Sequence, residues 1–506
     1  MANWNQVRYE NATIQSGIGN GVDQNKNPYM VQGDKAVYMK NGCGAISPGF
    51  QTMEDVYLDS DFSTRLPRQI FATPSSDGGT VDYVNVITET AWYGKSVSTN
   101  PFSSTDFTAV AVLTTGGSRP GMAQLKTGTK TYNILMDKIN KRYADIGSTA
   151  LAISSTTCPL TNIVTVYGNR VYCAQNAVLY YSALAKPEDW TTASDAGSIP
   201  IGSAKSDITC LVSYNNHVVI FTMTSMHELY GKGPTTYQIV DVSNSIGCVS
   251  HFAAAEVNGI LYWLGRDGVY SYNGAKITKI SDPFINETLD KMIAAGLEQD
   301  QYCAGSFAGR FFLSYHTTDN DADVDWIEYD SMRKQWYSIE TNFDDLSPAK
   351  TLVYLDACSQ NANNFYGIGK NGYIYSLWAS STGHGTLYDS LTSESAPIKF
   401  EEWGPPYTDN TLSNEKVLKR MYITADVGSK ARLTVGYTTE PYNYKNPESI
   451  EVHSLGNVLP SRDKAVVEVD MTPQPGTVQY SPILSGFGDV KVFGIQKDYR
   501  IKRNGR

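Results

Sequence analysis

The chain has 506 residues and a formal net charge of −10, from 51 acidic and 41 basic side chains. This acidic balance argues against a general nucleic-acid-binding protein, because such proteins carry a basic face. Tyrosine leads the aromatic residues at 34, and glycine reaches 42; both suit strands and tight turns, so the composition favours an all-β chain.

The first 34 residues are polar and rich in glycine, and they predict an extended arm that a partner or a neighbouring subunit orders. The chain begins MANWNQVRYENAT, without the basic and apolar regions of a secretory signal. No apolar run approaches the length that crosses a bilayer. We therefore expect a protein without a membrane span that is made and folded in a reducing cytosol.

The main predicted domain covers residues 35–380. Within 163–378 one unit recurs five times: a hairpin of aromatic or β-branched strands, followed by a shorter aromatic hairpin. The unit returns after about 43 to 55 residues, a period typical of β-propeller blades with four antiparallel strands. The tips of the five leading hairpins are Gly168-Asn169, Asn215-Asn216, Asn258-Gly259, Ala308-Gly309 and Asn363-Asn364.

Residues 35–150 contain further strand-like runs that would supply one or two more blades. The prediction is thus an all-β chain with a β-propeller of about six to seven blades, some of them incomplete. An ordinary β-sandwich with irregular hairpins is the alternative, because sandwiches also have short strands and frequent turns.

One segment, 281–297 (SDPFINETLDKMIAAGL), has the pattern of a helix. Ser281 or Asp282 would cap it, and Pro283 would occupy the first turn. We predict a helix near 283–297 that is inserted between blades as a strut, with a partner-binding helix as the alternative. Its apolar stripe would comprise Ile285, Leu289, Met292 and Ile293.

The acidic run TTDNDADVDWIEYD is the most distinctive charged segment. Its aspartates alternate as oxygen ligands do in calcium loops, but Val324 and Asp330 stand where an EF-hand needs glycine and glutamate. A solvated hairpin tip is the favoured interpretation, and a weak calcium site is the alternative. The candidate ligands are Asp319, Asp321, Asp323 and Asp325.

The C-terminal part divides into three predicted segments. Residues 381–395 have low hydrophobicity and predict a linker, and 396–496 contain new alternating strands that predict a small sandwich-like β-domain. The alternative is that the strands of this domain close the propeller. Residues 497–506 predict a basic tail that is either solvated or docked on an acidic partner surface or phosphates. The interface candidates there are Lys497, Arg500, Lys502, Arg503 and Arg506.

The seven cysteines are odd in number, widely spaced and without a C-x-x-C pair. This pattern argues against a disulfide framework and against a zinc knuckle. We expect the thiols to be free and to pack as small apolar residues. They are Cys43, Cys158, Cys173, Cys210, Cys248, Cys303 and Cys358.

Little in the sequence predicts catalysis. The six histidines are dispersed, and neither a G-x-S-x-G elbow nor a phosphate-binding glycine loop is present. SSDGGTVDY is one imperfect copy of the Asp-box of sialidases, and Glu401 and Glu402 are neighbours that would point to opposite faces of a strand. We predict that the chain is not an enzyme and has no cofactor.

Several phrases between residues 163 and 284 resemble the tail hub or nozzle proteins of short-tailed bacteriophages, including tail stabilisation and tail tube B proteins. A "YS…P.dW" phrase matches at Tyr181-Ser182 and 187–190. An "iF…lyG" phrase matches at 220–221 and 229–231, and a "GC…wl..dGvy…g" phrase at 247–248 and 263–274. The likeness extends more loosely to 47–50 (SPGF) and to the domain opening at 419–420.

This resemblance implies a structural virion protein of the tail, made in the host cytoplasm. Six copies would form a ring below the portal and adaptor proteins, continue the DNA channel and anchor a needle, fibres or spikes. The genome would pass without sequence-specific binding, and acidic side chains on the channel wall would repel its phosphates.

Two other functions stay open at this point. A glycan-binding or glycan-degrading tail propeller would use exposed aromatic side chains such as Trp326, Trp336 and Tyr337 to stack on sugars; the alternative is that these pack between blades. A cellular β-propeller scaffold for protein partners is the other possibility.

Overall fold

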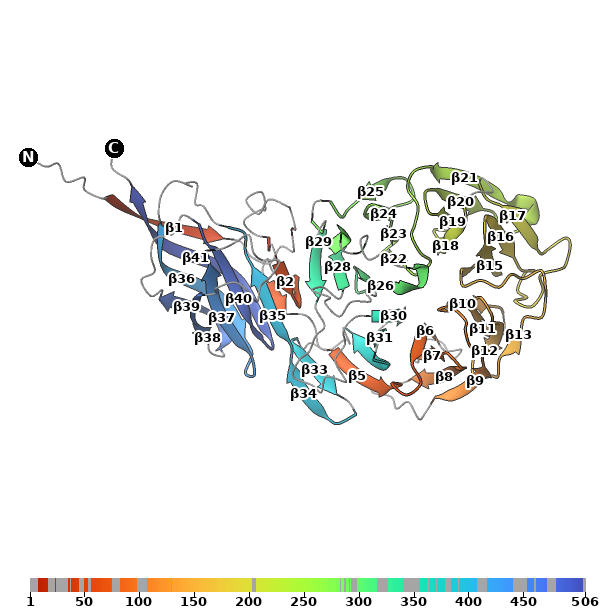
Figure 1. The fold of residues 1–506 in the computed structure, drawn as a ribbon, viewed down its shortest axis with the longest axis horizontal. Coiled ribbons are helices and arrows are strands. Elements are labelled where there is room, and N and C mark those ends of the chain that lie inside the picture. Colours follow the sequence, from red (N-terminus) through yellow and green to blue (C-terminus); the bar gives the residue numbers. More distant parts are fainter. Residues whose placement is uncertain are drawn as a thin grey trace, which may run out of the picture.

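The computed structural model contains almost only strands. The residues that it describes are 8–16, 23, 35–36, 38–44, 50–52, 56–74, 82–97, 107–128, 130–202, 206–282, 284–285, 288–290, 292, 298–315, 326–339, 355–361, 364–369, 371–377, 384–389, 391–406, 416–439, 453–458, 461–470 and 479–503. Figure 1 shows a ring of sheets at one end of the molecule and a two-sheet domain at the other, beside the rim of the ring.

The ring is a seven-bladed β-propeller, and each of its first six blades is a four-stranded antiparallel sheet in chain order. Blade 1 has β6 (Pro67–Pro74), β7 (Asp82–Thr88), β8 (Ala91–Val97) and β9 (Thr108–Val112). Blade 2 has β10 (Gly121–Lys126), β11 (Thr131–Met136), β12 (Lys141–Asp145) and β13 (Leu151–Ala152). Blade 3 has β14 (Val164–Tyr167), β15 (Arg170–Gln175), β16 (Val178–Tyr181) and β17 (Gly197–Pro200).

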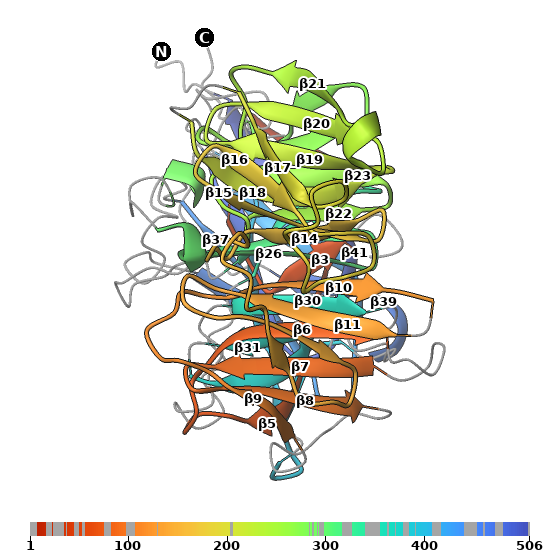
Figure 2. The ribbon, with the colours of Figure 1, turned by 90° about the vertical axis from the view of Figure 1, so that its right-hand side faces the viewer.

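Blade 4 has β18 (Ile208–Tyr214), β19 (His217–Thr222), β20 (Met226–Tyr230) and β21 (Gln238–Ser243), with the short helix η3 (Pro234–Thr236) before its last strand. Blade 5 has β22 (Ala254–Val257), β23 (Ile260–Leu264), β24 (Val269–Tyr272) and β25 (Ile277–Lys279). Blade 6 follows η4 (Gln299–Gln301) and has β26 (Tyr302–Phe307), β27 (Arg310–Tyr315), β28 (Trp326–Asp330) and β29 (Gln335–Ile339). Figure 2 shows blades 2 to 4 from the rim, with the second domain behind them.

Blade 7 closes the ring with strands from both ends of the propeller. β30 (Leu355–Asn361), β31 (Asn364–Gly369) and β32 (Tyr373–Leu377) pair in order, and β5 (Val56–Asp61) adds to the outer edge of β32. The hairpin β33 (Thr386–Asp389) and β34 (Glu394–Pro397) extends this sheet, because β33 pairs with β5 in parallel. The propeller therefore begins at β5 rather than at residue 35, and the predicted linker 381–395 contributes strands to blade 7.

Four of the five predicted hairpin tips are confirmed. Tyr167 pairs with Arg170 across Gly168-Asn169, whose φ angles are 55° and 59°. Positive φ at both central residues defines the type I′ turn that suits a twisted hairpin. The same holds for the tips at 215–216, 258–259 and 308–309. The fifth prediction was one residue late, because Asn361 pairs with Asn364 and the latter begins β31.

The predicted helix lies in the segment between blades 5 and 6. Residues 288–290 and 292 are helical, and the Leu289 amide donates to the Ile285 carbonyl at 3.0 Å. Ile285, Leu289 and Met292 are buried in the largest apolar cluster of the propeller, as the stripe predicted. Ile293 lies outside the described residues.

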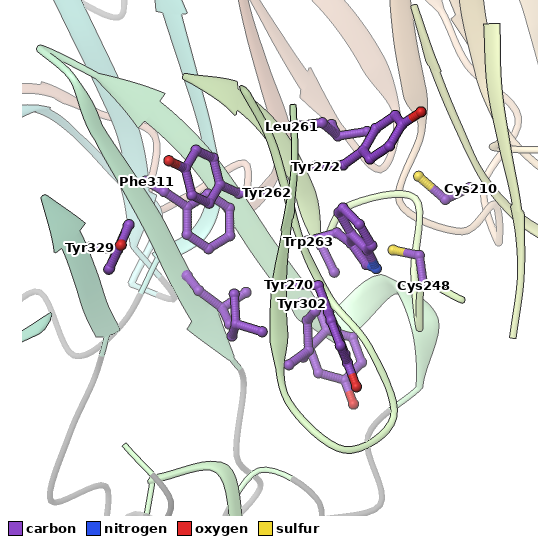
Figure 3. Packing of buried hydrophobic residues seen from close by; sticks show 14 of the residues in the cluster. Cys210, Cys248, Leu261, Tyr262, Trp263, Tyr270, Tyr272, Tyr302, Phe311 and Tyr329 are labelled. Atoms are coloured by element: carbon purple, nitrogen blue, oxygen red, sulfur yellow. The ribbon is translucent and has the colours of Figure 1, made fainter. Parts of the chain in front are cut away.

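This cluster joins blades 4, 5 and 6 through aromatic contacts (Figure 3). The rings of Phe221 and Trp263 lie 5.0 Å apart, and Tyr262 stacks on Phe311 at 5.6 Å. Trp326, Trp336 and Tyr337 are each 1% exposed. These three side chains therefore pack inside the protein and present no face to a sugar.

One side chain, Arg119, connects blades that are not neighbours in the ring. It donates to the Tyr302 carbonyl in blade 6 at 2.6 Å and to Gln69 Oε1 in blade 1 at 3.2 Å. Its guanidinium also lies 4.2 Å from the ring centre of Phe252, ahead of blade 5. The pKa of the adjacent His251 is lowered to about 4, by burial and by the Arg119 charge. Arg119 thus crosses the central channel of the propeller.

The second domain is a β-sandwich formed by both ends of the chain. One sheet has the order β3 (Gly42–Gly44), β4 (Phe50–Thr52), β41 (Val490–Arg503), β36 (Lys416–Val427) and β39 (Ser461–Asp470), with β1 (Arg8–Ser16) paired to the end of β41. The other has the order β2 (Tyr38–Lys40), β35 (Lys399–Trp403), β40 (Ser481–Phe487), β37 (Arg432–Thr438) and β38 (His453–Val458). The core between them includes Met421, Ile423, Leu433, Leu484 and Val492.

This pairing corrects two of the predicted boundaries. The domain predicted at 396–496 also uses β1 to β4, because long-range pairing places them beside β35 and β41. Part of the predicted N-terminal arm is therefore strand β1. The alternative in which the C-terminal strands close the propeller is wrong, since β5 does so.

The sandwich is joined to the propeller at blade 6. Tyr337 of β29 lies in the sandwich core cluster, and Lys35 Nζ donates to Gln335 Oε1 at 2.7 Å. The Ser338 hydroxyl donates to the carbonyl of Met39 in β2. Because β2 is itself a strand of the sandwich, these contacts fix one domain to the other.

Candidate assembly interface

The two ends of the chain form one ladder at the tip of the sandwich. β1 pairs with β41 from Arg8 opposite Arg503 to Ser16 opposite Ile495. β36 pairs with the other edge of β41, with Lys416 opposite Ile501. At a rise of about 3.3 Å per residue, the 14 residues of β41 span roughly 45 Å. Figure 1 shows this ladder at the end of the molecule farthest from the propeller, with both termini emerging from it.

Basic residues are concentrated in the ladder. In the segments 8–16, 416–421 and 495–503 the only acidic residues are Glu10 and Asp498. The basic residues there are Arg8, Lys416, Lys419, Arg420, Lys497, Arg500, Lys502 and Arg503. The strand register brings all of these positions to one end of a chain whose net charge is −10. This end is therefore suited to an acidic partner surface.

The predicted basic tail is a strand over most of its length. Lys497, Arg500, Lys502 and Arg503 all lie in β41, and Arg506 lies outside the described residues. The prediction of a tail was wrong. The charged residues of this segment alternate with Tyr499 and Ile501, and such alternation is typical of strands. Lys497 and Arg500 pair with strands on both sides of β41, and Lys502 and Arg503 pair with β1, so these positions belong to a regular strand.

The four candidate calcium ligands lie outside the described residues. They are Asp319, Asp321, Asp323 and Asp325. Across the ranges that the structure describes, no group of three or more His, Cys, Asp or Glu side chains is placed to hold a metal ion. In the same ranges, no helix has the length and apolar character to span a membrane.

Glu401 and Glu402 lie on β35, as neighbours with different surroundings. Glu402 is 2% exposed, whereas Glu401 is half-buried and accepts a hydrogen bond from the indole of Trp403. The two side chains thus follow the alternation that the sequence predicted.

Sequence reasoning missed a chain of hydrogen bonds in blade 4. Ser225 Oγ lies 2.8 Å from Nε2 of His227, and Nδ1 of the same ring lies 2.6 Å from Asp241 Oδ1. This is the connectivity of a nucleophile, a base and an orienting carboxylate. Ser225 and His227 are two residues apart in sequence, but Asp241 lies beside His227 only because β20 pairs with β21, so no local motif could reveal the full set.

Two features favour a structural role for this chain of bonds. The Asp241 side chain is 66% exposed, so water screens its charge. The Ser225 hydroxyl also lies 2.7 Å from Thr222 Oγ1, within the turn that joins β19 to β20. The three residues therefore tie this turn to the outer strand of the blade.

A fluorophosphonate probe, which reacts with activated serine hydroxyls, is expected to leave Ser225 unmodified. The physical reason is that an exposed carboxylate polarises the imidazole weakly. Intact mass after incubation measures the result, with Ser225→Ala as the matched control. A mass increase in the wild type that the variant lacks would make the expectation of a non-enzyme wrong.

Comparison with known proteins finds similarity to solved structures only. No protein-family model matches the chain, and no curated protein matches it either. The crystal structure of BamB from Moraxella catarrhalis is similar over 68% of this chain and 96% of its own, with a TM-score of 0.36 and 10% identity. The computationally designed Ika8 protein is similar over 64% and 99%, with a TM-score of 0.36 and 11% identity. The assignment of the propeller fold rests on the strand pairing of this chain itself.

Proposed function

We propose that the chain is a structural subunit of a ring in the tail of a short-tailed bacteriophage, in the class of tail hub or nozzle proteins. The observation that carries this proposal is the basic strand ladder, which both chain ends build at the tip of a sandwich fixed to a closed propeller. A rigid body with a charged, structured extension suits a subunit that binds its neighbours edge to edge.

Residues in the sequence phrases that resemble the tail proteins make buried packing and hydrogen-bond contacts, which suits an architectural role. Trp190 is 2% exposed, and its indole donates to the Pro187 carbonyl at 2.8 Å. The Trp263 indole donates to the Gly247 carbonyl at 3.0 Å. A Cβ at Gly247 would lie 2.2 Å from the Thr222 carbonyl oxygen, so the close approach of two backbones requires glycine there.

The proposed partners are other copies of the chain, the portal-adaptor protein above the ring, and a needle, fibre or spike protein. Arg119 crosses the channel of each propeller, so genome DNA would pass between the subunits of the ring. A basic surface would hold the phosphates of passing DNA. We therefore place the strand ladder in protein contacts and acidic side chains on the channel wall.

Native mass measurement and electron microscopy of the full chain test this proposal. The expected result is a closed sixfold ring, whereas a monomer or a trimer would overturn the proposal. In the triple variant Arg500→Glu, Lys502→Glu, Arg503→Glu the ring is expected to dissociate, because repulsion replaces attraction to the acidic neighbour. The matched control reverses three exposed propeller charges, Lys126→Glu, Lys138→Glu and Lys186→Glu, and is expected to keep the ring. If the triple variant at 500, 502 and 503 still forms the ring, the ladder is not the interface between subunits, although the proposal of a ring stands.

A further inference from the structure

Six of the seven cysteines have described side chains, and these six lie in three pairs. Cys303 Sγ and Cys358 Sγ are 3.2 Å apart. Cys210 and Cys248 lie in the same apolar cluster and interact with one another there (Figure 3). Cys158 and Cys173 likewise lie in one apolar cluster and interact with one another there.

Each pair joins a strand of one blade either to the connecting segment beside that blade or to the next blade. Cys158 lies between blades 2 and 3, and its partner lies on β15 of blade 3. Cys210 lies on β18 of blade 4, and its partner lies between blades 4 and 5. The third pair connects the first strands of blades 6 and 7. The partners are about 15, 38 and 55 residues apart in sequence, so only the propeller fold brings them together.

We propose that these three thiol pairs are oxidation sites, and that they form the disulfides Cys158–Cys173, Cys210–Cys248 and Cys303–Cys358 when an oxidised small thiol reaches the folded protein. Each disulfide would be a covalent cross-link between neighbouring parts of the propeller. The predicted absence of a disulfide framework would then describe only the newly made protein.

The chemistry is thiol–disulfide exchange, and its atoms and electrons balance. One thiolate of a pair attacks a sulfur of the oxidised small thiol, which releases one small thiolate and leaves a mixed disulfide. The second thiolate of the pair attacks the protein sulfur of that bond and releases the other small thiolate. The two protons that the cysteines lose pass to the two released thiolates, and two electrons reduce the oxidant.

The surroundings of the pairs keep this reaction slow in a reducing cytosol. Burial raises the pKa of Cys173 and of Cys210, and the close contact with Cys303, followed by burial, raises the pKa of Cys358. Only a small fraction of these three thiols, one in each pair, is thus the reactive thiolate. Cys358 is the most exposed of the six, so its pair is expected to oxidise first. A disulfide needs about 2.05 Å between its sulfur atoms, so the Sγ atoms of Cys303 and Cys358 have to approach one another by roughly 1 Å.

To test this proposal, the native full chain is incubated with oxidised glutathione at mildly alkaline pH. The reaction is quenched with acid, and free thiols are counted after the protein has been unfolded. The expected count falls from seven to one in steps of two, and the mass falls by about 2 Da per disulfide. Peptide mapping is expected to find the three named pairs. The melting temperature of the oxidised protein is expected to rise by several degrees.

Two variants sharpen the result. Cys43→Ser removes the one thiol that belongs to none of the three proposed disulfides, so the count of free thiols in this variant is expected to fall to zero. Cys303→Ser removes one pair, so two thiols are expected to remain, on Cys43 and Cys358. A count that stays at seven in the native wild type would overturn the proposal. Mapped disulfides between other partners would overturn it equally.

Discussion

Leu58→Ala is expected to destabilise the protein by about 2–5 kcal/mol, the range for a buried leucine that leaves a cavity. Leu58 is completely buried in β5, and it lies opposite Tyr375 on one side and Asp389 on the other. Among the described strands, β5 is the one from the start of the propeller that pairs within the sheet of blade 7. Loss of its packing therefore weakens closure of the ring as well as one local contact.

The matched control is Leu151→Ala in β13, the outer strand of blade 2. Leu151 is 59% exposed, so the same change there is expected to cost less than about 0.5 kcal/mol. Urea unfolding followed by tryptophan fluorescence measures both variants. Equal effects at the two positions would contradict a special role of β5 in closing the ring.

The contacts of β5 also show why its place could not be predicted from the sequence. Val56 pairs with Leu377 and with Leu387, which lie more than 300 residues along the chain. A strand pattern states only that a residue is in a strand, and nothing local states which strand it pairs with. Tyr57 stacks on Tyr388 with ring centres 4.8 Å apart, but each tyrosine alone looks like any other half-buried aromatic residue.

Local features were predicted well for the opposite reason. A type I′ turn needs positive φ at two successive residues, and Asn-Gly, Gly-Asn and Asn-Asn satisfy that need within the turn itself. The helical stripe of Ile285, Leu289 and Met292 is also a local pattern. The cysteine pairs and the basic ladder are features of long-range pairing, so the spacing of cysteines was uninformative and the ladder was read as a tail.

Closure by β5 and pairing of β1 with β41 have a common consequence. The propeller is inserted between the two parts of the sandwich, so both chain ends leave the molecule at the basic ladder. The sandwich connects the ladder to blade 6, where hydrogen bonds of Lys35 and Ser338 fix the two domains to one another. This arrangement suits a subunit that transmits force between a neighbour and a rigid body.

Glu228 is the second position at which a single change is expected to have a large effect. The side chain is 4% exposed and accepts three hydrogen bonds. Its Oε1 lies 3.0 Å from His217 Nε2 and 2.8 Å from the Tyr272 hydroxyl. Its Oε2 accepts from the Tyr230 hydroxyl at 2.7 Å. Because Tyr272 belongs to blade 5, this carboxylate joins two blades by polar contacts.

Glu228→Ala is expected to cost about 3–5 kcal/mol, since it leaves buried donors without their acceptor. Glu228→Gln keeps the volume and one acceptor oxygen, so its cost is expected to be smaller. Glu256→Ala on the neighbouring β22 is the matched control, because that carboxylate is exposed. Urea unfolding at neutral pH measures all three. A cost for Glu228→Ala as small as that of the control would contradict the polar connection between the blades.

The same carboxylate also contributes to how stability changes at alkaline pH. Its hydrogen bond is the main cause that raises the pKa of Tyr230 from 10.0 to about 12. A tyrosine whose pKa is higher in the folded state favours folding below pH 10, and this contribution is lost as the pH rises to about 12. Because Glu228→Ala removes the cause, the free energy of unfolding of the variant is expected to fall less between these pH values than that of the wild type. Equal slopes in urea unfolding across this range would show that Glu228 does not hold the Tyr230 proton.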